Sequence, residues 1–226
     1  AEERNEKFFI HGKMKGTTNI IELSTKDICV KKDLYTIPAK DDEHKFALEN
    51  FYADNIDSVY PEVYNILTDD SISEIDFNTR LKIINTALSL YFRTPKFLNY
   101  HNELIQKIIS DIAKLKNDQE TIKIDLFGNN LEFKKNELEE VVKEFKEHNR
   151  IQFLLGHLEI YEKFVMYKLK DGIGVLKLVD DSLFLTSDNP VIIRNKNSMN
   201  NIFDPENIIH LPLNEKYLLT IIPKSE

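Results

Sequence analysis

The sequence predicts an α+β fold: a central α-helical bundle of about four helices, with a small antiparallel β-sheet formed from N- and C-terminal strands. Apolar residues recur at helical spacing between residues 43 and 170, and short β-leaning runs bounded by turns lie before and after them. No internal repeat or linker interrupts the 226 residues. Because helices in the middle and strands at both ends are typical of the α+β class, we expect a single domain over residues 1–226.

The first half of the chain is divided by turns and prolines. Two β-leaning runs around a GKMKG break predict a hairpin over residues 7–24. Helical spacing starts at residue 43 and continues to about residue 67, and Pro61 should kink or split this helix because proline removes a backbone hydrogen bond. A second, largely buried helix should run from about Asp76 to the RTP motif, residues 93–95. The proline of that motif disfavours helix at the preceding residue and suits the first turn of a third helix.

The second half of the chain is expected to contain a hairpin insertion, the longest helix and a C-terminal sheet. The stretch TIKIDLFGNNLEF predicts a hairpin over residues 121–133 with its turn at GNN. A helix from residue 136 to about 170 is charged in its first half, which should face water, and apolar in its second half, which should enter the core. Five strands should follow over residues 174–223, in the stretches GVLKLVD, SLFLTS, PVIIR, IIHLPL and YLLTIIP.

Composition restricts the partners and the compartment. The chain has 38 acidic and 30 basic residues and a net charge of −8, so it should repel a polyanion, and nucleic acid is not favoured as a partner. Cys29 is the only cysteine, so the chain alone can form neither a disulfide nor a cysteine-based zinc site, which favours a reducing compartment. We find no signal-peptide core and no apolar run of about 18 residues. We expect a cytoplasmic protein without a membrane partner, and a protein partner stays open.

The turn in FLTSDNPVIIR, residues 184–194, holds the first candidate for chemistry. An aspartate in a turn normally accepts a hydrogen bond from the N–H two residues on, but Pro190 has none to offer to Asp188. Ser187 can instead accept from Asn189. The Asp188 carboxylate therefore lacks its usual local partner, and we favour Arg93, whose forked guanidinium suits a carboxylate. Such a pair is either a structural link between helix and sheet or part of a reactive site.

His157 is the second candidate. It shares a helical stripe with Phe153, Ile160 and Phe164, so its ring should point into an apolar region. Such a histidine is either a hydrogen-bonded core residue or a general base that a partner must orient.

Carboxylates on the first helix are the third candidate. Glu49 and Asp57 are eight residues apart, about two helical turns, and make an acidic line with Glu62. Solvation at the surface explains such a line. Alternatively, Glu49 and Asp57 could bind a divalent cation such as magnesium or manganese with Asp188 as a third ligand, because these ions prefer oxygen ligands. The phosphate-loop, nucleophile-elbow, zinc-protease and dinucleotide-binding signatures are all absent.

The order of the segments resembles the bacterial domain-of-unknown-function family 4238. The resemblance spans nearly the whole chain and depends on the segments YTI, ALENFYADNID, FRTPKF, the long helix with His157, FLTSDNPVII and HLPLNEKYLL. It places the motif positions of the family on Glu49, Asp57, Arg93, Thr94, Pro95, His157 and residues 187–190. It implies no activity. Members begin with a short element carrying His and Pro, which we expect this chain to lack.

Two functional hypotheses follow. The first is an enzyme, a metal-assisted hydrolase or nuclease in a toxin or phage-defence setting. Its metal ligands would be Asp188, Glu49 and Asp57, its catalytic groups Asp188, Arg93 and His157, and its substrate-binding residues Ser187, Asn189 and Thr94. The second is a non-catalytic binding or sensor module, in which the RTP and SDNP motifs are structural and a surface groove receives a protein or small molecule.

Overall fold

The computed structural model describes residues 2–4, 7–14, 16–26, 34–115, 120–126, 129–195 and 202–224. Helices and small antiparallel sheets make up the chain, which confirms the α+β class. The chain divides into two compact units, Ala1–Leu34 and Tyr35–Glu226, where the sequence analysis expects one domain. Cys29 lies outside the described residues.

The first unit is a three-stranded antiparallel sheet of β1 (Glu2–Arg4), β2 (Lys7–Lys13) and β3 (Ile20–Ser24). The predicted hairpin over residues 7–24 is confirmed as the pair β2–β3, and β1 is an additional strand. The prediction that these strands share a sheet with the C-terminal strands is wrong. Both edges of β2 are taken by β1 and β3, its nearest neighbours in sequence, so its backbone groups are paired within the unit.

The second unit contains the helices, and its helix boundaries follow the local signals. Proline splits the first predicted helix as expected, because α3 begins at Tyr60 with Pro61 in its first turn. The side chain of Asp76 caps the next helix by accepting from the N–H of Thr79. In chain order the helical elements are α1 (Asp42–Lys45), α2 (Ala47–Tyr52), a π-helical turn (Ala53–Asp57), α3 (Tyr60–Thr68), α4 (Phe77–Phe92), α5 (Pro95–Leu115) and α6 (Leu138–Lys168).

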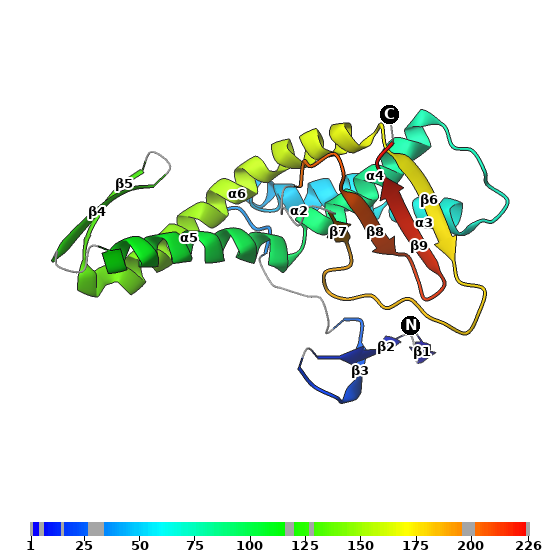
Figure 1. Ribbon diagram of the computed structural model, residues 1–226, viewed down its shortest axis with the longest axis horizontal. Coiled ribbons are helices and arrows are strands. Elements are labelled where there is room, and N and C mark those ends of the chain that lie inside the picture. Colours follow the sequence, from blue (N-terminus) through cyan, green and yellow to red (C-terminus); the bar gives the residue numbers. More distant parts are fainter. Residues whose placement is uncertain are drawn as a thin grey trace. The chain divides into compact units, whose positions relative to one another are not determined.

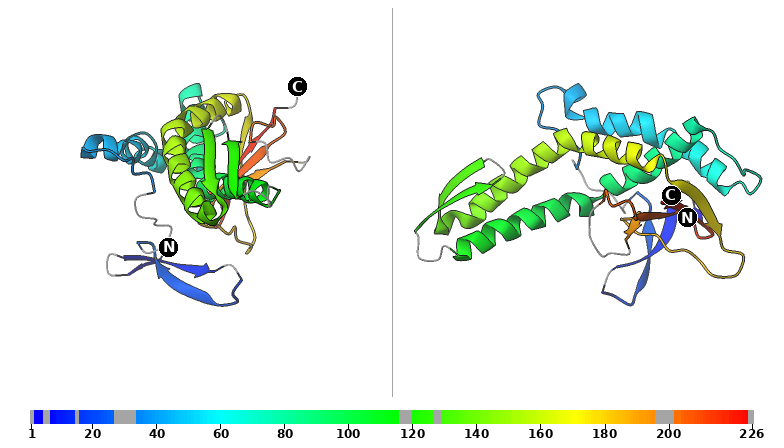
Figure 2. Two further views of the ribbon diagram at one scale, coloured as in Figure 1. Left: turned by 90° about the vertical axis from the view of Figure 1, so that its left-hand side faces the viewer. Right: turned by 45° about the horizontal axis from the view of Figure 1, so that its top comes forward.

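Helices α5 and α6 run side by side, and the hairpin of β4 (Thr121–Leu126) and β5 (Asn129–Lys134) lies at the end where α5 leads out and α6 returns (Figures 1 and 2). The predicted hairpin is confirmed, but Asn129 and Asn130, expected in its turn, are strand residues that pair with Leu126 and Asp125, and Gly128 lies outside the described residues. A small second core joins the three elements through Ile109, Ile122, Ile124, Phe133, Val142 and Phe145. The first half of α6 was expected to face water, but its Val142 and Phe145 are buried in this core.

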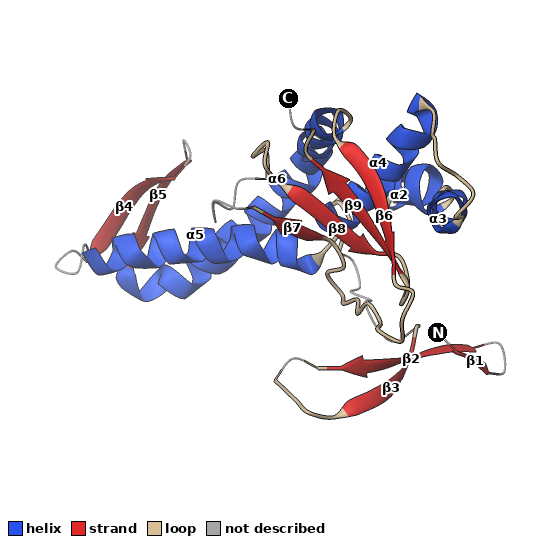
Figure 3. Ribbon diagram, turned by 45° about the vertical axis from the view of Figure 1, so that its right-hand side comes forward, coloured by secondary structure: helices blue, strands red, loops and turns tan. Residues whose placement is uncertain are grey.

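The C-terminal sheet has four antiparallel strands in the order β6 (Gly172–Lys177), β9 (Tyr217–Ile222), β8 (Ile208–Pro212) and β7 (Ile192–Arg194), as Figure 3 shows. The expected strand in SLFLTS is absent, and residues 182–187 belong to an irregular connection. A backbone hydrogen bond runs from the Phe184 N–H to the carbonyl of Glu215, and the Lys216 ammonium donates to the carbonyl of Ser182. Leu183 and Leu185 are exposed there, so burial does not favour a strand.

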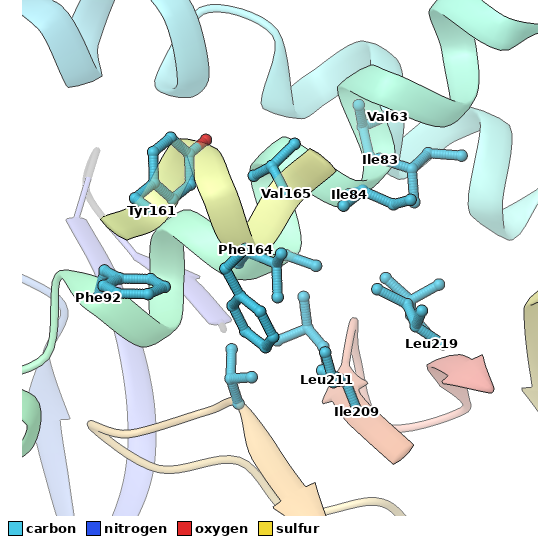
Figure 4. Packing of buried hydrophobic residues seen from close by; sticks show 14 of the residues in the cluster. Val63, Ile83, Ile84, Phe92, Tyr161, Phe164, Val165, Ile209, Leu211 and Leu219 are labelled. Carbon is cyan, nitrogen blue, oxygen red and sulfur yellow. The ribbon is translucent and has the colours of Figure 1, made fainter. Parts of the chain in front are cut away.

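One face of this sheet packs on helices α4 and α6 and forms the main core. Phe164 of α6 points toward Ile209 and Leu211 of β8, and Phe92 lies beside Tyr161 (Figure 4). All five side chains are buried. The core fixes the end of α4, where Arg93 stands, and the face of α6 that carries His157.

Candidate functional site

His157 is part of a buried polar contact between α6 and α2. It has no exposed surface, its Nε2 lies 2.7 Å from the Tyr52 hydroxyl, and its Nδ1 lies 3.1 Å from the carbonyl of Leu154. Because a carbonyl only accepts, Nδ1 carries the proton and Nε2 accepts from Tyr52. Burial lowers the pKa of His157, so the ring is neutral at pH 7. The expected apolar surroundings are confirmed by the ring of Phe153, which stacks at 5.2 Å, whereas Ile160 of the same predicted stripe is 38% exposed.

Tyr52 connects His157 to an aromatic and cationic cluster. Its buried ring has an edge-to-face contact with Tyr35 at 5.7 Å between centroids, and the guanidinium carbon of Arg93 lies 4.7 Å from its centroid. Burial raises the pKa of Tyr52 and of Tyr35, so both phenols keep their protons at neutral pH. Tyr52 is therefore a hydrogen-bond donor to His157 and a surface for the cation of Arg93.

Arg93 follows the last turn of α4 and binds the carboxylate of Asp57 with both arms of its fork. Its two terminal nitrogens donate to the two Asp57 oxygens at 2.6 and 3.1 Å. Burial alone would lower the pKa of Arg93, but hydrogen bonding to Asp57 and its charge outweigh burial and raise that pKa. The favoured pair of Arg93 with Asp188 is thus replaced by a pair with Asp57, because the π-helical turn that ends at Asp57 packs against α4.

Thr94 joins two helices. Its buried hydroxyl donates to the carbonyl of Tyr91 at 2.9 Å and accepts from the N–H of Phe97 at 3.3 Å. It therefore closes α4 and caps α5, so the hydroxyl that was expected to bind substrate is hydrogen bonded within the fold.

The TSDNP turn closes on itself as the sequence predicts. The N–H of Asn189 donates to the Ser187 hydroxyl oxygen at 3.1 Å, and that hydroxyl donates to the carbonyl of Asn189 at 3.1 Å. Asp188 is exposed, and within the described part of the chain it has no hydrogen-bond or ion-pair partner. The Asp188 carboxylate, which the hydrogen bonds of the turn do not use, faces water.

The predicted metal ligands are not brought together. Over the described ranges, no three His, Cys, Asp or Glu side chains are grouped closely enough to hold a metal ion, so the expected site of Glu49, Asp57 and Asp188 is not formed. Glu49 is exposed on α2, and Asp57 is bound by Arg93. The expectation assumed a regular helix between Glu49 and Asp57, but the π-helical turn breaks the 3.6-residue period.

A buried ion pair at the end of α6 is the polar feature that the sequence analysis missed. Lys168 and Asp171 are fully or almost fully buried, and the Lys168 Nζ donates to the Asp171 carboxylate at 2.7 Å and to the carbonyl of Asn207 at 3.0 Å. Arg80 of α4 donates to the backbone carbonyl of Asp171 at 2.6 Å. The sequence signal, a lysine three residues before an aspartate at a helix end, looks the same in the many pairs that are exposed.

The comparisons with known proteins identify a family and no individual relative. No helix of the described chain is long and apolar enough to cross a membrane. The comparison with curated proteins gives no match, and neither does the comparison with solved structures. One family model, described as "Protein of unknown function (DUF4238)", matches residues 4–226. The match covers almost the whole chain, and the chain therefore belongs to the DUF4238 family.

Proposed function

We propose that this chain is a non-catalytic binding or sensor module of the cytoplasm, in which the RTP and SDNP motifs serve the fold. The observation that carries the proposal is the state of His157. A general base must reach the proton that it removes from a substrate. His157 has no exposed surface, and both of its ring nitrogens are already hydrogen bonded within the chain. It is equipped to join α2 to α6.

The RTP motif supports the same proposal. An arginine that stabilises developing negative charge must aim the fork of its guanidinium at the substrate. Both terminal nitrogens of Arg93 donate to Asp57, and its guanidinium covers the ring of Tyr52. Thr94 uses its hydroxyl at the junction of α4 and α5. These contacts connect four helical elements, which is the work of a structural motif.

A specific observation favours a second candidate, the metal-assisted hydrolase or nuclease of a toxin or phage-defence system. Asp188 has an exposed carboxylate without an intramolecular partner in the described ranges, so it is available to a cation or to water. In this candidate Asp188 would need other ligands than Glu49 and Asp57. Binding of a cation at Asp188 should then be measurable directly.

The experiment that separates the two proposals compares wild type, Asp188→Asn and Asp181→Asn. Asp181 is also exposed and lies in the same connection, so it controls for the loss of one surface charge. Thermal unfolding is recorded with and without MgCl₂ or MnCl₂, and hydrolysis of bis(p-nitrophenyl) phosphate is followed in the same samples. A ligand that binds the folded state raises its unfolding midpoint. We expect no cation-dependent shift and no turnover above the buffer rate.

A cation-dependent rise of the midpoint, or turnover, that Asp188→Asn abolishes and Asp181→Asn retains would overturn the binding-module proposal in favour of the hydrolase. Expression in a bacterial host adds a second readout. Growth arrest by wild type that Asp188→Asn relieves at equal protein level would point the same way.

A further inference from the structure

A pocket lies between the helices and the β6 edge of the C-terminal sheet. Its lining includes neither the RTP motif, nor His157, nor the TSDNP turn. It has a volume of about 300 Å³ and is formed by the end of α3, the connection from α3 to α4, α4 itself, β6 and the first residue of β9. This volume is at the lower end of the range for small-molecule sites. The pocket belongs entirely to the second unit.

Part of the pocket wall is aliphatic. Branched side chains from both layers line it: Ile66, Leu67, Ile75, Ile83, Ile173 and Val175. Leu67 and Ile83 are buried members of the main core, so the inner wall is rigid, whereas Val175 stands at the exposed edge. Ligand sites typically combine such an apolar interior with a few placed polar groups. Among the residues that the structure describes, Tyr217 is the aromatic side chain that lines this pocket.

The polar groups of the pocket form a rim with more negative than positive charge. Asp69, Asp70 and Lys177 line the pocket together with Tyr217. The Lys177 ammonium is paired with the carboxylate of Asp70, which also accepts from the Tyr217 hydroxyl at 3.3 Å. Asp69 is held by the N–H and hydroxyl of Ser71, at 2.9 and 2.6 Å, and has no cation beside it in the described residues. Two carboxylates thus face one ammonium.

The rim already shows how an ammonium is held here. Lys177 and Tyr217 are directly opposite on the paired strands β6 and β9, and the Lys177 Nζ lies 5.2 Å from the Tyr217 ring centroid. A carboxylate on one side and an aromatic face on the other are the groups that recognise ammonium ions. Lys177 is neutralised by Asp70, so a ligand anion would have to displace that carboxylate. A ligand cation would instead find Asp69 available.

We propose that this pocket binds a small organic cation, a protonated aliphatic amine whose ammonium pairs with Asp69 beside the Asp70–Lys177 pair and whose hydrocarbon chain lies on the aliphatic wall. This inference rests on the proposed binding function and names the class of ligand. The charge of the rim selects the ammonium, and the branched side chains select an aliphatic body.

The test uses hexylammonium as the probe in isothermal titration calorimetry with the full chain at neutral pH. Hexanoate has a similar chain with the opposite charge, hexanol has no charge, and methylammonium has the head without the chain. We expect hexylammonium to bind measurably more tightly than each of these three. Equal binding of hexanol would show that the charged rim does not select the ligand and would overturn the proposal. Preferred binding of hexanoate would overturn it in favour of an anion site at Lys177.

Two variants locate the binding site. Asp69→Asn keeps a side chain that can accept from Ser71 but removes the charge, and it should weaken hexylammonium binding about five-fold, as expected for one partly exposed ion pair. Val175→Phe should fill the mouth of the pocket and abolish binding. Asp181→Asn lies outside the pocket and should bind like wild type. Unchanged affinity in both pocket variants would refute this site, even if the unfolding midpoint of Val175→Phe had changed.

The outcomes for the pocket and for the proposed function are separate. Failure of the pocket proposal would leave the separate prediction, that Asp188 supports neither metal binding nor turnover, unchanged. Conversely, Asp188-dependent turnover would overturn the binding-module proposal whether or not an amine enters this pocket.

Discussion

Helix α6 and the TSDNP turn, residues 186–190, both carry polar residues that stand out in the sequence, but the two regions differ in burial. On α6, His157 and Lys168 have no exposed surface, and the His157 Nε2 and the Lys168 ammonium are hydrogen bonded to groups outside the helix. In the turn, Ser187 and Asn189 bond each other, and the exposed Asp188 faces water. Polar groups are expensive to bury without partners. The α6 residues should therefore control stability, and the turn should tolerate change.

The largest effect is expected at the buried end of α6. Lys168→Met removes one partner of a buried pair and leaves the Asp171 carboxylate uncompensated, which should cost about 3–5 kcal/mol. For a unit of this size the unfolding midpoint should fall by about 6–20 °C. Lys163→Met is the matched control on the same helix, because Lys163 pairs with Glu159 at the surface. Its cost should stay below about 0.5 kcal/mol. Equal unfolding midpoints for the two variants would contradict the expected difference between the buried and the exposed ion pair of α6.

A smaller effect is expected at the contact between α2 and α6. Tyr52→Phe removes the donor to His157 and leaves its buried Nε2 without a hydrogen bond, which should cost about 1–3 kcal/mol. Tyr60→Phe is the control, because no hydrogen bond of the Tyr60 hydroxyl is present among the described residues. Urea unfolding of both variants measures the difference. If Tyr60→Phe proves as costly as Tyr52→Phe, the buried hydrogen bond does not carry the effect.

The buried neutral state of His157 predicts a pH dependence. Because the pKa of His157 is lowered in the fold, the unfolded chain takes up this proton at a higher pH than the folded chain. Its contribution to stability is full above the ordinary histidine pKa of about 6.5 and is lost as the pH falls through that value toward the lowered one. His157→Gln should therefore flatten the decline of the unfolding free energy between about pH 7.5 and 5.5. Burial also lowers the pKa of His210, so part of the decline should remain.

The Arg93–Asp57 pair lies between the two extremes. The Asp57 side chain is 52% exposed, so Asp57→Asn should cost about 1 kcal/mol or less, and added salt should reduce this cost. Glu62→Gln is the control, because the Glu62 side chain is as exposed as that of Asp57 and pairs with the more flexible Lys82. Its cost should be the smaller of the two, since a forked contact with arginine has better geometry. The reverse order in urea unfolding would show that the fork adds nothing.

The smallest effect is expected in the turn. Asp188→Asn removes an exposed charge that has no partner among the described residues, so stability should stay within about 0.5 kcal/mol of wild type. The turn itself should persist because Ser187 and Asn189 still bond each other. Differential scanning calorimetry against wild type checks this. A fall of the midpoint by about 6 °C or more would mean that Asp188 is a structural residue after all.

The sequence by itself determined what local chemistry controls. Pro61 and the RTP motif set helix boundaries, α4 begins next to Asp76, and Ser187 closes the TSDNP turn, as their sequence neighbours predicted. The order of the segments also sufficed to indicate the family. In each of these cases the interacting groups lie within a few residues, so the backbone rules fix the outcome without knowledge of the fold.

Only the tertiary structure decided which distant groups meet. Arg93 forms an ion pair with Asp57, 36 residues away, and His157 is hydrogen bonded to Tyr52, 105 residues away. Tertiary packing also determines three further features: the separate N-terminal sheet, the irregular conformation of residues 182–187 and the burial of Lys168. Sequence patterns give the face and the chemistry of a side chain, but its partner depends on how whole elements pack. Arg93 pairs with Asp57 because the π-helical turn that ends at Asp57 packs against α4, which the sequence pattern did not predict.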